Sequence, residues 1–431
     1  MISGIFIPIL RRLATQTLLD IFDIKESYKL PDKIMEALMS DRAEMIVREI
    51  KENTNCDIRD LFQEEQGDRK KLKQDFTPDC IATLVADLMK NGDALDMCSG
   101  VGTLTKAAVK AHGFCICEQE FSERTIPFAL LEACMEGMEG DISRADCLRE
   151  NVVETFKLQR IGDISIPKEI PPKKAGRYDN VIMNPPYSMK FQDAEQYPMK
   201  GFVIPKNKAD YGFLLRGLEH LKDGGRLIAI LPHGVLFRGN REGEIREQLT
   251  KQHLINAVIG LPDKLFLNTS IPVCLLILEQ DSPNVLFVDA SKDFEKGTAQ
   301  NDMNADQIHR IVDAFEKRRD IENYAHIAAY EEIAGNDYNL SIPRYVDTFK
   351  AEPLPDIENI LRELKAINEE VEKVGASLYR MLGELVGSIE DEKQIKKHRE
   401  LLERKCNMVF TKEGKAYPRQ LELRDLYEFE M

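Results

Sequence analysis

The segment Asn184-Pro185-Pro186-Tyr187 combines residue types that suit methyl transfer to a planar NH2 group. The nitrogen of such a group is a poor nucleophile because its lone pair is delocalised. The side-chain oxygen of Asn184 and the carbonyl of Pro185 can each accept one of its N–H bonds and thereby localise the lone pair. The prolines stiffen the turn, and Tyr187 offers a flat face for an unstacked base. The four residues also fit an ordinary proline-rich loop after the apolar strand predicted at residues 179–183. The sequence upstream of the turn decides between a methyl-transfer site and such a loop.

A glycine turn lies upstream, between a predicted strand at residues 94–97 and a predicted helix at residues 103–112. A strand, a glycine turn and a helix form the opening unit of a nucleotide-binding sheet. Gly100 and Gly102 permit positive φ and close approach of a ligand to the backbone. Asp96 precedes them and a third glycine is missing, which favours a cofactor with a positively charged amino-acid moiety over one with a pyrophosphate. S-adenosylmethionine fits this description.

Acidic residues stand at the ends of two further predicted strands. Residues 113–117 predict the second strand, and Glu118 and Glu120 follow it, about 20 residues beyond the glycine turn, where a ribose diol is held in related sheets. Either glutamate can hold a diol, and both also fit a solvated strand end. Residues 144–148 predict the end of a third strand, where Asp146 can accept a hydrogen bond from an adenine amino group.

These pieces occur in a recognisable order. The segment Gln74-Asp75-Phe76-Thr77-Pro78 comes first, and the glycine turn, the acidic strand ends and the Asn-Pro-Pro-Tyr turn follow. In this order the chain resembles the γ-type N6-adenine DNA methyltransferases, and most closely the modification (M) subunits of type I restriction–modification systems. The resemblance covers residues 74 to about 345. Beyond the catalytic turn it continues through residues 208–213, 223–232, 234–239, 259–262, 271–272 and 337–346.

The resemblance implies S-adenosylmethionine-dependent methylation of adenine N6 in a specific DNA sequence, after the base has flipped out of the duplex. The implied cofactor-binding residues are Phe76, Thr77 and Pro78 at the methionine end, Asp96, Gly100 and Gly102 at the amino-acid moiety, Glu120 at the ribose and Asp146 at the adenine, together with Ser99 and Cys147. The implied residues around the target adenine are Asn184, Pro185, Pro186 and Tyr187. The chain departs from the family pattern in its glycine-poor turn, in Glu118, which replaces a commonly small residue, and in a shorter segment before Phe76.

Composition narrows the function classes further. The seven histidines show no metal-ligand spacing, so no metal is expected. The nine cysteines include no C-x2-C pair, which is typical of free thiols in a reducing cytoplasm. No run of about 18 apolar residues occurs, so no membrane partner is expected. These features together predict a cytoplasmic protein.

The net charge bears on DNA binding. The chain carries 59 basic and 74 acidic residues, a formal charge of −15, whereas a protein that holds duplex DNA alone normally presents excess positive charge. We therefore expect part of the affinity for double-stranded DNA to come from another subunit. The resemblance identifies this partner as the specificity (S) subunit, and a larger assembly would add a second M subunit and a restriction subunit.

The expected fold class is α/β, with a Rossmann-like methyltransferase sheet, a helical N-terminal region and a long C-terminal helix. The sheet is completed by the strand after the Asn-Pro-Pro-Tyr turn and by the apolar runs at residues 254–260, 273–279 and 285–289. The predicted boundaries are residues 1–75 for the N-terminal region, 76–350 for the catalytic domain, 351–405 for the C-terminal helix and 406–431 for a tail. The loop at residues 191–206 is expected to close over the flipped base.

The C-terminal helix is predicted by apolar residues that recur at alternating four- and three-residue steps from Ile357 to Ile389, with Asn368 as a polar position. Such a helix can fold back on its own domain, or it can pair with a partner, which the resemblance identifies as the S subunit. Two other functions stay open. Protein-glutamine methyltransferases of release factors share the Asn-Pro-Pro-Tyr turn, and an M-like scaffold of a phage-defence complex would have lost cofactor binding.

Overall fold

The computed structural model describes most of the chain as two compact units, Met1–Phe349 and Lys350–Met431. The described residues are 17–53, 58, 62, 76–113, 115–267, 271–298, 300–347, 357–385, 388–406, 408–410 and 416–418. The predicted N-terminal region and tail therefore lie partly outside the described residues, and so does the start of the 74–78 segment.

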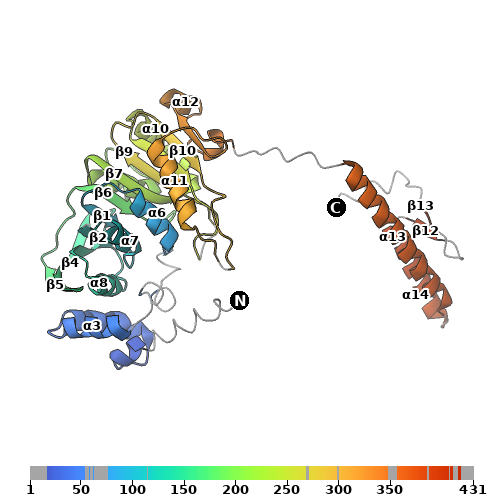
Figure 1. The fold of residues 1–431 in the computed structure, drawn as a ribbon, viewed down its shortest axis with the longest axis horizontal. Coiled ribbons are helices and arrows are strands. Elements are labelled where there is room, and N and C mark those ends of the chain that lie inside the picture. The colour runs from blue at the N-terminus through green and yellow to red at the C-terminus, as the bar shows by residue number, and fades with distance from the viewer. Residues whose placement is uncertain are drawn as a thin grey trace. The chain divides into compact units, whose positions relative to one another are not determined.

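The first unit is built around one large mixed sheet (Figure 1). Within the described residues the strand order is β11-β10-β8-β9-β7-β6-β1-β2-β3-β4-β5. The strands are β1 (Ala94–Met97), β2 (Ile116–Glu120), β3 (Gly140–Asp146), β4 (Asn151–Ile161), β5 (Ile164–Ile170), β6 (Tyr178–Met183), β7 (Leu221–Pro232), β8 (Ile255–Gly260), β9 (Val273–Glu279), β10 (Val285–Asp289) and β11 (Ala325–Ala328). The five central strands, β7-β6-β1-β2-β3, are all parallel. This arrangement confirms the predicted α/β class.

The central strands are buried on both faces because helices cover both sides of the sheet. Along β6, Val181 and Met183 face one hydrophobic cluster and Ile182 faces the other, as the period of two requires. The helices of this unit are α2 (Leu30–Leu38), α3 (Ala43–Asn53), α6 (Asp79–Asp87), α7 (Thr103–His112), α8 (Ile126–Met135), α9 (Asp210–Glu219), α10 (Asn240–Lys251), α11 (Ala305–Lys317) and α12 (Tyr330–Gly335). Residues of α9 and α10 enter the first cluster, and residues of α6, α7 and α11 enter the second.

A third hydrophobic cluster attaches the N-terminal region to the sheet. It joins α2, α3 and α8 to β3, β4 and β5, and its members lie between Leu18 and Ile164. Leu18, Ile34 and Ile50 are fully buried in it. The described N-terminal residues thus share a core with α8 and with the strands β3, β4 and β5, and form one compact unit with them.

Several predicted elements differ from the observed ones. The second strand begins at Ile116 and includes Glu118 and Glu120, so both glutamates lie in the strand and not after it. The strands β4, β5 and β11 were not predicted. In β4, buried residues such as Phe156 and Leu158 alternate with exposed ones, which is the pattern of an antiparallel strand with one solvated face.

The second unit contains α13 (Ile357–Glu384), α14 (Ile389–Cys406) and a short hairpin of β12 (Met408–Phe410) and β13 (Ala416–Pro418). The prediction of a single helix through residue 405 is therefore wrong. The reason is local, because Ser388 starts a new helix. The backbone N–H and the hydroxyl of Ser388 both donate to Asp391 Oδ2, at 2.8 and 2.7 Å, and Asp391 N–H donates to the Ser388 hydroxyl at 3.3 Å. This reciprocal pairing is the capping-box arrangement of a helix start.

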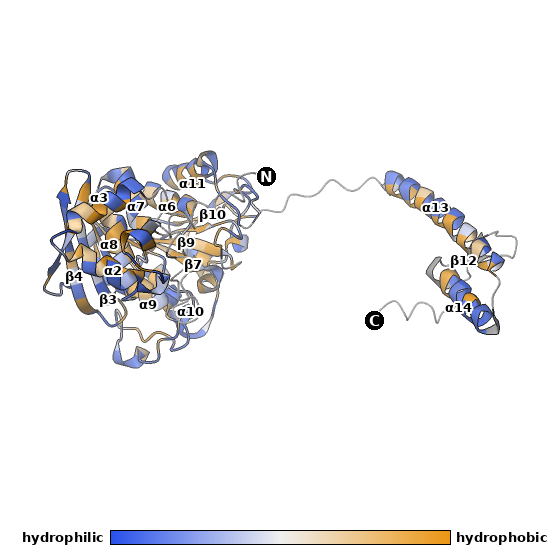
Figure 2. Cartoon of the chain, turned by 90° about the horizontal axis from the view of Figure 1, so that it is seen from below, coloured by the Kyte–Doolittle hydropathy of each residue, from blue (hydrophilic) through white to orange (hydrophobic). Residues whose placement is uncertain are grey.

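One face of α13 is exposed and apolar, and Figure 2 shows hydrophobic positions interspersed with hydrophilic ones along this helix. It contains Leu361, Leu364, Val371 and Leu378 of the predicted stripe and a further row at seven-residue spacing, so the apolar face is wider than these stripe residues alone. The exposed apolar residues of α13 are Ile360, Leu361, Leu364, Ile367, Val371, Val374, Leu378 and Met381, and Leu385 follows them. Across the described residues, no helix is both long enough and apolar enough to cross a membrane.

Candidate active site

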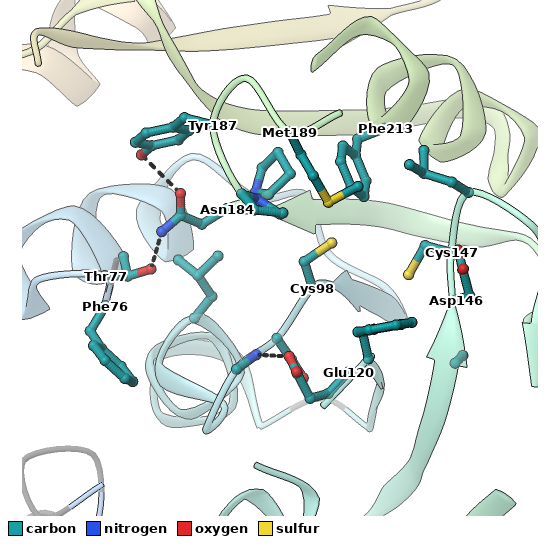
Figure 3. Close-up of a pocket in the computed structure, with 18 of the residues that line it drawn as sticks. Phe76, Thr77, Cys98, Glu120, Asp146, Cys147, Asn184, Tyr187, Met189 and Phe213 are labelled. Atoms are coloured by element: carbon teal, nitrogen blue, oxygen red, sulfur yellow. Dashed lines mark hydrogen bonds between the residues drawn. The ribbon is translucent and has the colours of Figure 1, made fainter. Parts of the chain in front are cut away.

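The Asn-Pro-Pro-Tyr turn begins directly after β6, at the carboxyl edge of the sheet. The Asn184 side-chain amide is held at both ends (Figure 3): its Nδ2 donates to Thr77 Oγ1 at 3.0 Å, and its Oδ1 accepts from the Tyr187 hydroxyl at 2.9 Å. A carbonyl oxygen has two lone pairs, so Oδ1 can accept a second hydrogen bond. The amide is thus fixed in orientation by Thr77 and Tyr187.

Tyr187 is largely buried, although it lines the cavity beside the turn. Its ring meets the ring of Phe266 edge to face, with 6.2 Å between the ring centroids. Sequence reasoning gave Tyr187 the role of a stacking surface. The structure adds a second contribution, because the tyrosine hydroxyl orients the Asn184 amide.

The buried carboxylate of Asp210 binds the residues around the Asn-Pro-Pro-Tyr turn. Asp210, at the start of α9, is fully buried and accepts from the backbone N–H of Ser188 at 2.8 Å. Its other oxygen accepts from Arg238 Nη1 at 2.9 Å. Ser188 has a φ of 49°, in the left-handed region that costs energy for residues other than glycine. The Asp210 carboxylate therefore stabilises the conformation with which the chain leaves the Asn-Pro-Pro-Tyr turn.

A cavity of about 270 Å³ opens between this turn and the ends of β1, β2 and β3. Eleven of the predicted site residues line it: Phe76, Thr77, Ser99, Gly100, Glu120, Asp146, Cys147, Asn184, Pro185, Pro186 and Tyr187. The site lies where β1 has β2 on one side and β6 on the other, which is the usual position of a ligand in an open parallel sheet.

The remaining predicted residues, Pro78, Asp96 and Gly102, are not in the cavity wall. Pro78 precedes α6, and Gly102 precedes α7 with a φ of 85°. Asp96 is fully buried below the glycine turn, where its Oδ2 accepts from Thr105 Oγ1 at 3.0 Å. Asp96 therefore joins the end of β1 to α7 through Thr105, and it is not among the residues that line the cavity.

Of the two candidate diol-binding glutamates, the structure places Glu120 in the cavity wall. Glu120 Oε2 accepts from the backbone N–H of Gly100 at 3.0 Å, and its Oε1 accepts from that of Ser122 at 2.7 Å. Burial raises the pKa of Glu120, and these backbone N–H groups partly offset the increase. Each oxygen keeps a further lone pair for a ligand hydroxyl. Gly100 has a φ of 61°, so this turn requires the left-handed conformation that glycine adopts without strain.

The cavity also has walls that sequence reasoning did not assign. The lining residues outside the predicted site residues are Cys98, Val101, Thr103, Leu104, Phe121, Ala145, Leu148, Arg149, Met189, Lys190, Phe191 and Phe213, of which only Phe191 belongs to a segment, 191–206, that was expected to approach the base. Phe121 directly follows Glu120 and is 60% exposed. A large apolar side chain next to the acidic end of a strand could have indicated in the sequence that Phe121 lines the site. Among the described residues, no cluster of three or more His, Cys, Asp or Glu side chains could hold a metal ion.

Glu118 faces Asp96 instead of the cavity, because the two residues are direct partners in the parallel pairing of β1 and β2. Burial raises the pKa of Glu118 from 4.5 to about 7. Burial and the neighbouring negative charge of Glu118 also raise the pKa of Asp96. Two carboxylates side by side in a dry interior cannot both ionise without a large cost.

We predict that Glu118→Gln stabilises the protein at alkaline pH. The folded pKa of Glu118 exceeds its unfolded value, so its contribution to stability is fully present below about pH 4.5 and is lost as the pH rises through about 7. At pH 8 the variant should gain on the order of 2–3 kcal/mol in free energy of unfolding. Urea unfolding at pH 5 and pH 8 measures this gain, with the exposed Glu123→Gln as the matched control. An equal effect of Glu118→Gln at both pH values would contradict the prediction.

The comparisons with known proteins agree with this geometry. Residues 60–353 match the family model described as N-6 DNA Methylase. The match covers more than half of the chain, and the chain therefore belongs to the N-6 DNA methylase family.

The relatives include methylase subunits of type I restriction enzymes, as the sequence predicted. The chain is 31% identical over 235 residues to the MjaVII methylase subunit of Methanocaldococcus jannaschii, which covers 50% of this chain and 39% of that protein. It is 27% identical over 353 residues to the HindI methylase subunit of Haemophilus influenzae, which covers 74% of this chain and 75% of that protein. The chain spans 39% and 54% of the MjaVII and MjaVIII subunits, about half of their lengths.

Among solved structures, the chain is similar to the crystal structure of the type I restriction-modification system methyltransferase subunit from Streptococcus thermophilus. The TM-score is 0.58 and the sequence identity 33%, over 73% of this chain and 72% of that chain. The predicted resemblance and the methyltransferase fold are thereby confirmed.

Proposed function

We propose that this chain transfers a methyl group from S-adenosylmethionine to the N6 amino group of adenine in DNA, in the cytoplasm, as the modification subunit of a type I restriction–modification complex. The observation that carries the proposal is the Asn184 amide, held between Thr77 and Tyr187 in the wall of a cavity that Glu120 and Asp146 also line. Membership of the N-6 DNA methylase family supports the same conclusion.

The residues on the cofactor side fit S-adenosylmethionine. Glu120 offers carboxylate oxygens to a ribose diol, and Asp146, at the end of β3, offers an acceptor to an adenine amino group. When bound, the cofactor supplies an electrophilic methyl carbon on a sulfonium. The glycine turn lets the backbone approach this ligand closely at Gly100.

The residues on the substrate side then act on the target base. An adenine inside a duplex cannot reach the cavity, so it must flip out of the stack, and Tyr187 offers it a ring face. Asn184 Oδ1 and the Pro185 carbonyl accept the two N–H bonds of the amino group and direct its lone pair toward the methyl carbon. No side chain must act as a strong base, because the nitrogen loses its proton to water after attack.

The acidic chain is proposed to receive its sequence specificity, and part of its DNA affinity, from the S subunit. The formal charge of −15 opposes strong DNA binding by this chain alone. The exposed apolar face of α13 is the proposed docking surface for helices of the S subunit. A second M subunit and a restriction subunit would complete the larger assembly.

Three measurements test the proposal against its alternatives. Calorimetric titration with S-adenosylmethionine should give saturable binding, whereas a scaffold without cofactor binding would show none. Incubation of the chain and an S-like protein from a neighbouring gene with plasmid DNA should yield N6-methyladenine, detected by mass spectrometry of the nucleosides. Methylation of a glutamine in a release factor, with no methylated DNA, would instead establish the protein-glutamine alternative.

We predict that the orientation of the Asn184 amide affects the chemical step. Thr77→Val removes the acceptor for Nδ2, and Tyr187→Phe removes the donor to Oδ1. Each loses one hydrogen bond, so the single-turnover methylation rate should fall about three- to tenfold. Thr77→Ser, which keeps the hydroxyl, is the matched control and should stay near the wild-type rate. A wild-type rate for Thr77→Val would show that the Thr77 contact does not orient the amide.

A further inference from the structure

Arg149 binds the carboxylate that closes the cofactor side of the cavity. Its backbone N–H donates to Asp146 Oδ1 at 3.1 Å, and its Nη1 donates to Asp146 Oδ2 at 2.6 Å. Both oxygens of Asp146 are therefore held by one residue. A carboxylate has about four lone-pair sites, so Asp146 can still accept a hydrogen bond from a ligand while it remains bonded to Arg149.

The same guanidinium reaches the segment of residues 191–206, on the substrate side of the cavity. Arg149 Nη2 donates to Asp193 Oδ2 at 2.5 Å. The guanidinium carbon also lies over two aromatic rings of this segment, at 4.9 Å from the ring centroid of Phe191 and 5.9 Å from that of Tyr197. Such cation–π contacts add to the ion pair and favour one position of the guanidinium.

The 191–206 segment forms part of the cavity wall. Phe191 lines the cavity and is buried. Its backbone N–H donates to the Lys206 carbonyl at 2.8 Å, which joins the two ends of the segment. Asp193, in contrast, has a side chain that is 41% exposed and does not line the cavity. A change at Asp193 therefore alters the link to Arg149 without removing a wall of the site.

We infer that Arg149 is a positioning residue that links cofactor binding to the order of the 191–206 segment through its contacts with Asp146 and Asp193. This inference rests on the proposed function and extends it to coupling between the two halves of the site. A cofactor adenine that donates to Asp146 restricts this carboxylate and, through it, Arg149 and the segment. Because coupling between two sites is reciprocal, a substrate that orders the segment strengthens cofactor binding in turn.

The test measures hydrogen–deuterium exchange of the backbone amides in residues 191–206, in the full chain, with and without S-adenosylhomocysteine as the probe ligand. In the wild type, the ligand should slow exchange in this segment by about fivefold or more. Asp193→Asn removes the charge that pairs with Arg149, so it should bind the ligand within about twofold of wild type and lose most of this protection. Arg149→Gln should lose the protection and also bind the ligand more weakly.

The matched control is Glu195→Gln, which lies in the same segment and pairs with Lys206 at 3.1 Å instead of with Arg149. It should retain the ligand-induced protection. Wild-type protection in Asp193→Asn, with the ligand bound, would overturn the inference and leave the proposed function standing. Failure of the wild-type chain to bind S-adenosylhomocysteine or S-adenosylmethionine would overturn both.

Discussion

Replacement of Asn184 by alanine is expected to lower the methylation rate by about 10²-fold or more, by analogy with the loss of one preorganised hydrogen-bonding group at a reacting centre. The variant loses the side-chain oxygen that accepts one N–H of the target amino group. It keeps the cavity residues Glu120 and Asp146, so the affinity for S-adenosylmethionine should stay near wild type. Single-turnover methyl transfer and calorimetric titration measure the two effects separately.

Asn184→Asp is the informative companion variant. It keeps oxygen acceptors at the position of the amide, so it should retain more activity than the alanine variant. The Thr77 hydroxyl can rotate to donate to the new carboxylate. An undiminished rate in Asn184→Ala would show that the amide takes no part in the reaction and would refute the assigned mechanism.

Glutamate substitutions on the apolar face of α13 are expected to abolish sequence-specific methylation. Leu364 and Leu378 are 51% and 44% exposed in the isolated chain, and docking of an S subunit would bury them. Leu364→Glu and Leu378→Glu would each place an unpaired charge in an apolar interface, at a cost that a helix pair cannot offset. Because α13 belongs to the second unit, cofactor binding by the first unit should be spared.

A pull-down with the S-like protein, followed by methylation of a plasmid that carries its target, measures this effect. Lys373→Glu, an exposed charge reversal outside the apolar face of α13, is the matched control and should assemble normally. Specific methylation by the Leu364→Glu chain at the wild-type level would favour a solitary methyltransferase.

Much of the first unit was predictable because its central strands are continuous apolar runs. The run at residues 179–183 and the strand at 94–97 correspond to β6 and β1, and the helix at 103–112 matches α7. The break between α13 and α14 was missed because the heptad spacing continues across it. The sequence did contain a sign of the break, because Ser388 and Asp391 have the spacing of a helix start. Their reciprocal hydrogen bonds begin a new helix although the apolar spacing continues.

The site was predictable in its composition but not in its hydrogen bonds. Thr77 and Asn184 are 107 residues apart, and only the packing of the Thr77 segment against the end of β6 brings them together. The surroundings of Asp96 were not predictable for a related reason. Its location before the glycine turn suggested a ligand contact, and the structure shows that it pairs with Glu118 in the sheet, accepts a hydrogen bond from Thr105 and is not among the residues that line the cavity.

The position of β1 between β2 and β6 has a consequence for synthesis on the ribosome. The third hydrophobic cluster draws only on residues between Leu18 and Ile164, so it can assemble before β6, which begins at Tyr178, has emerged. Synthesis proceeds at about 5–20 residues per second. The edge of β1 that pairs with β6 therefore stays unpaired for a time on the order of seconds. The half of the site that carries Glu120 and Asp146 can fold in this interval, and the half that carries Asn184 joins it later. A nascent chain that stalls in this interval would expose the β1 edge to pairing with other chains.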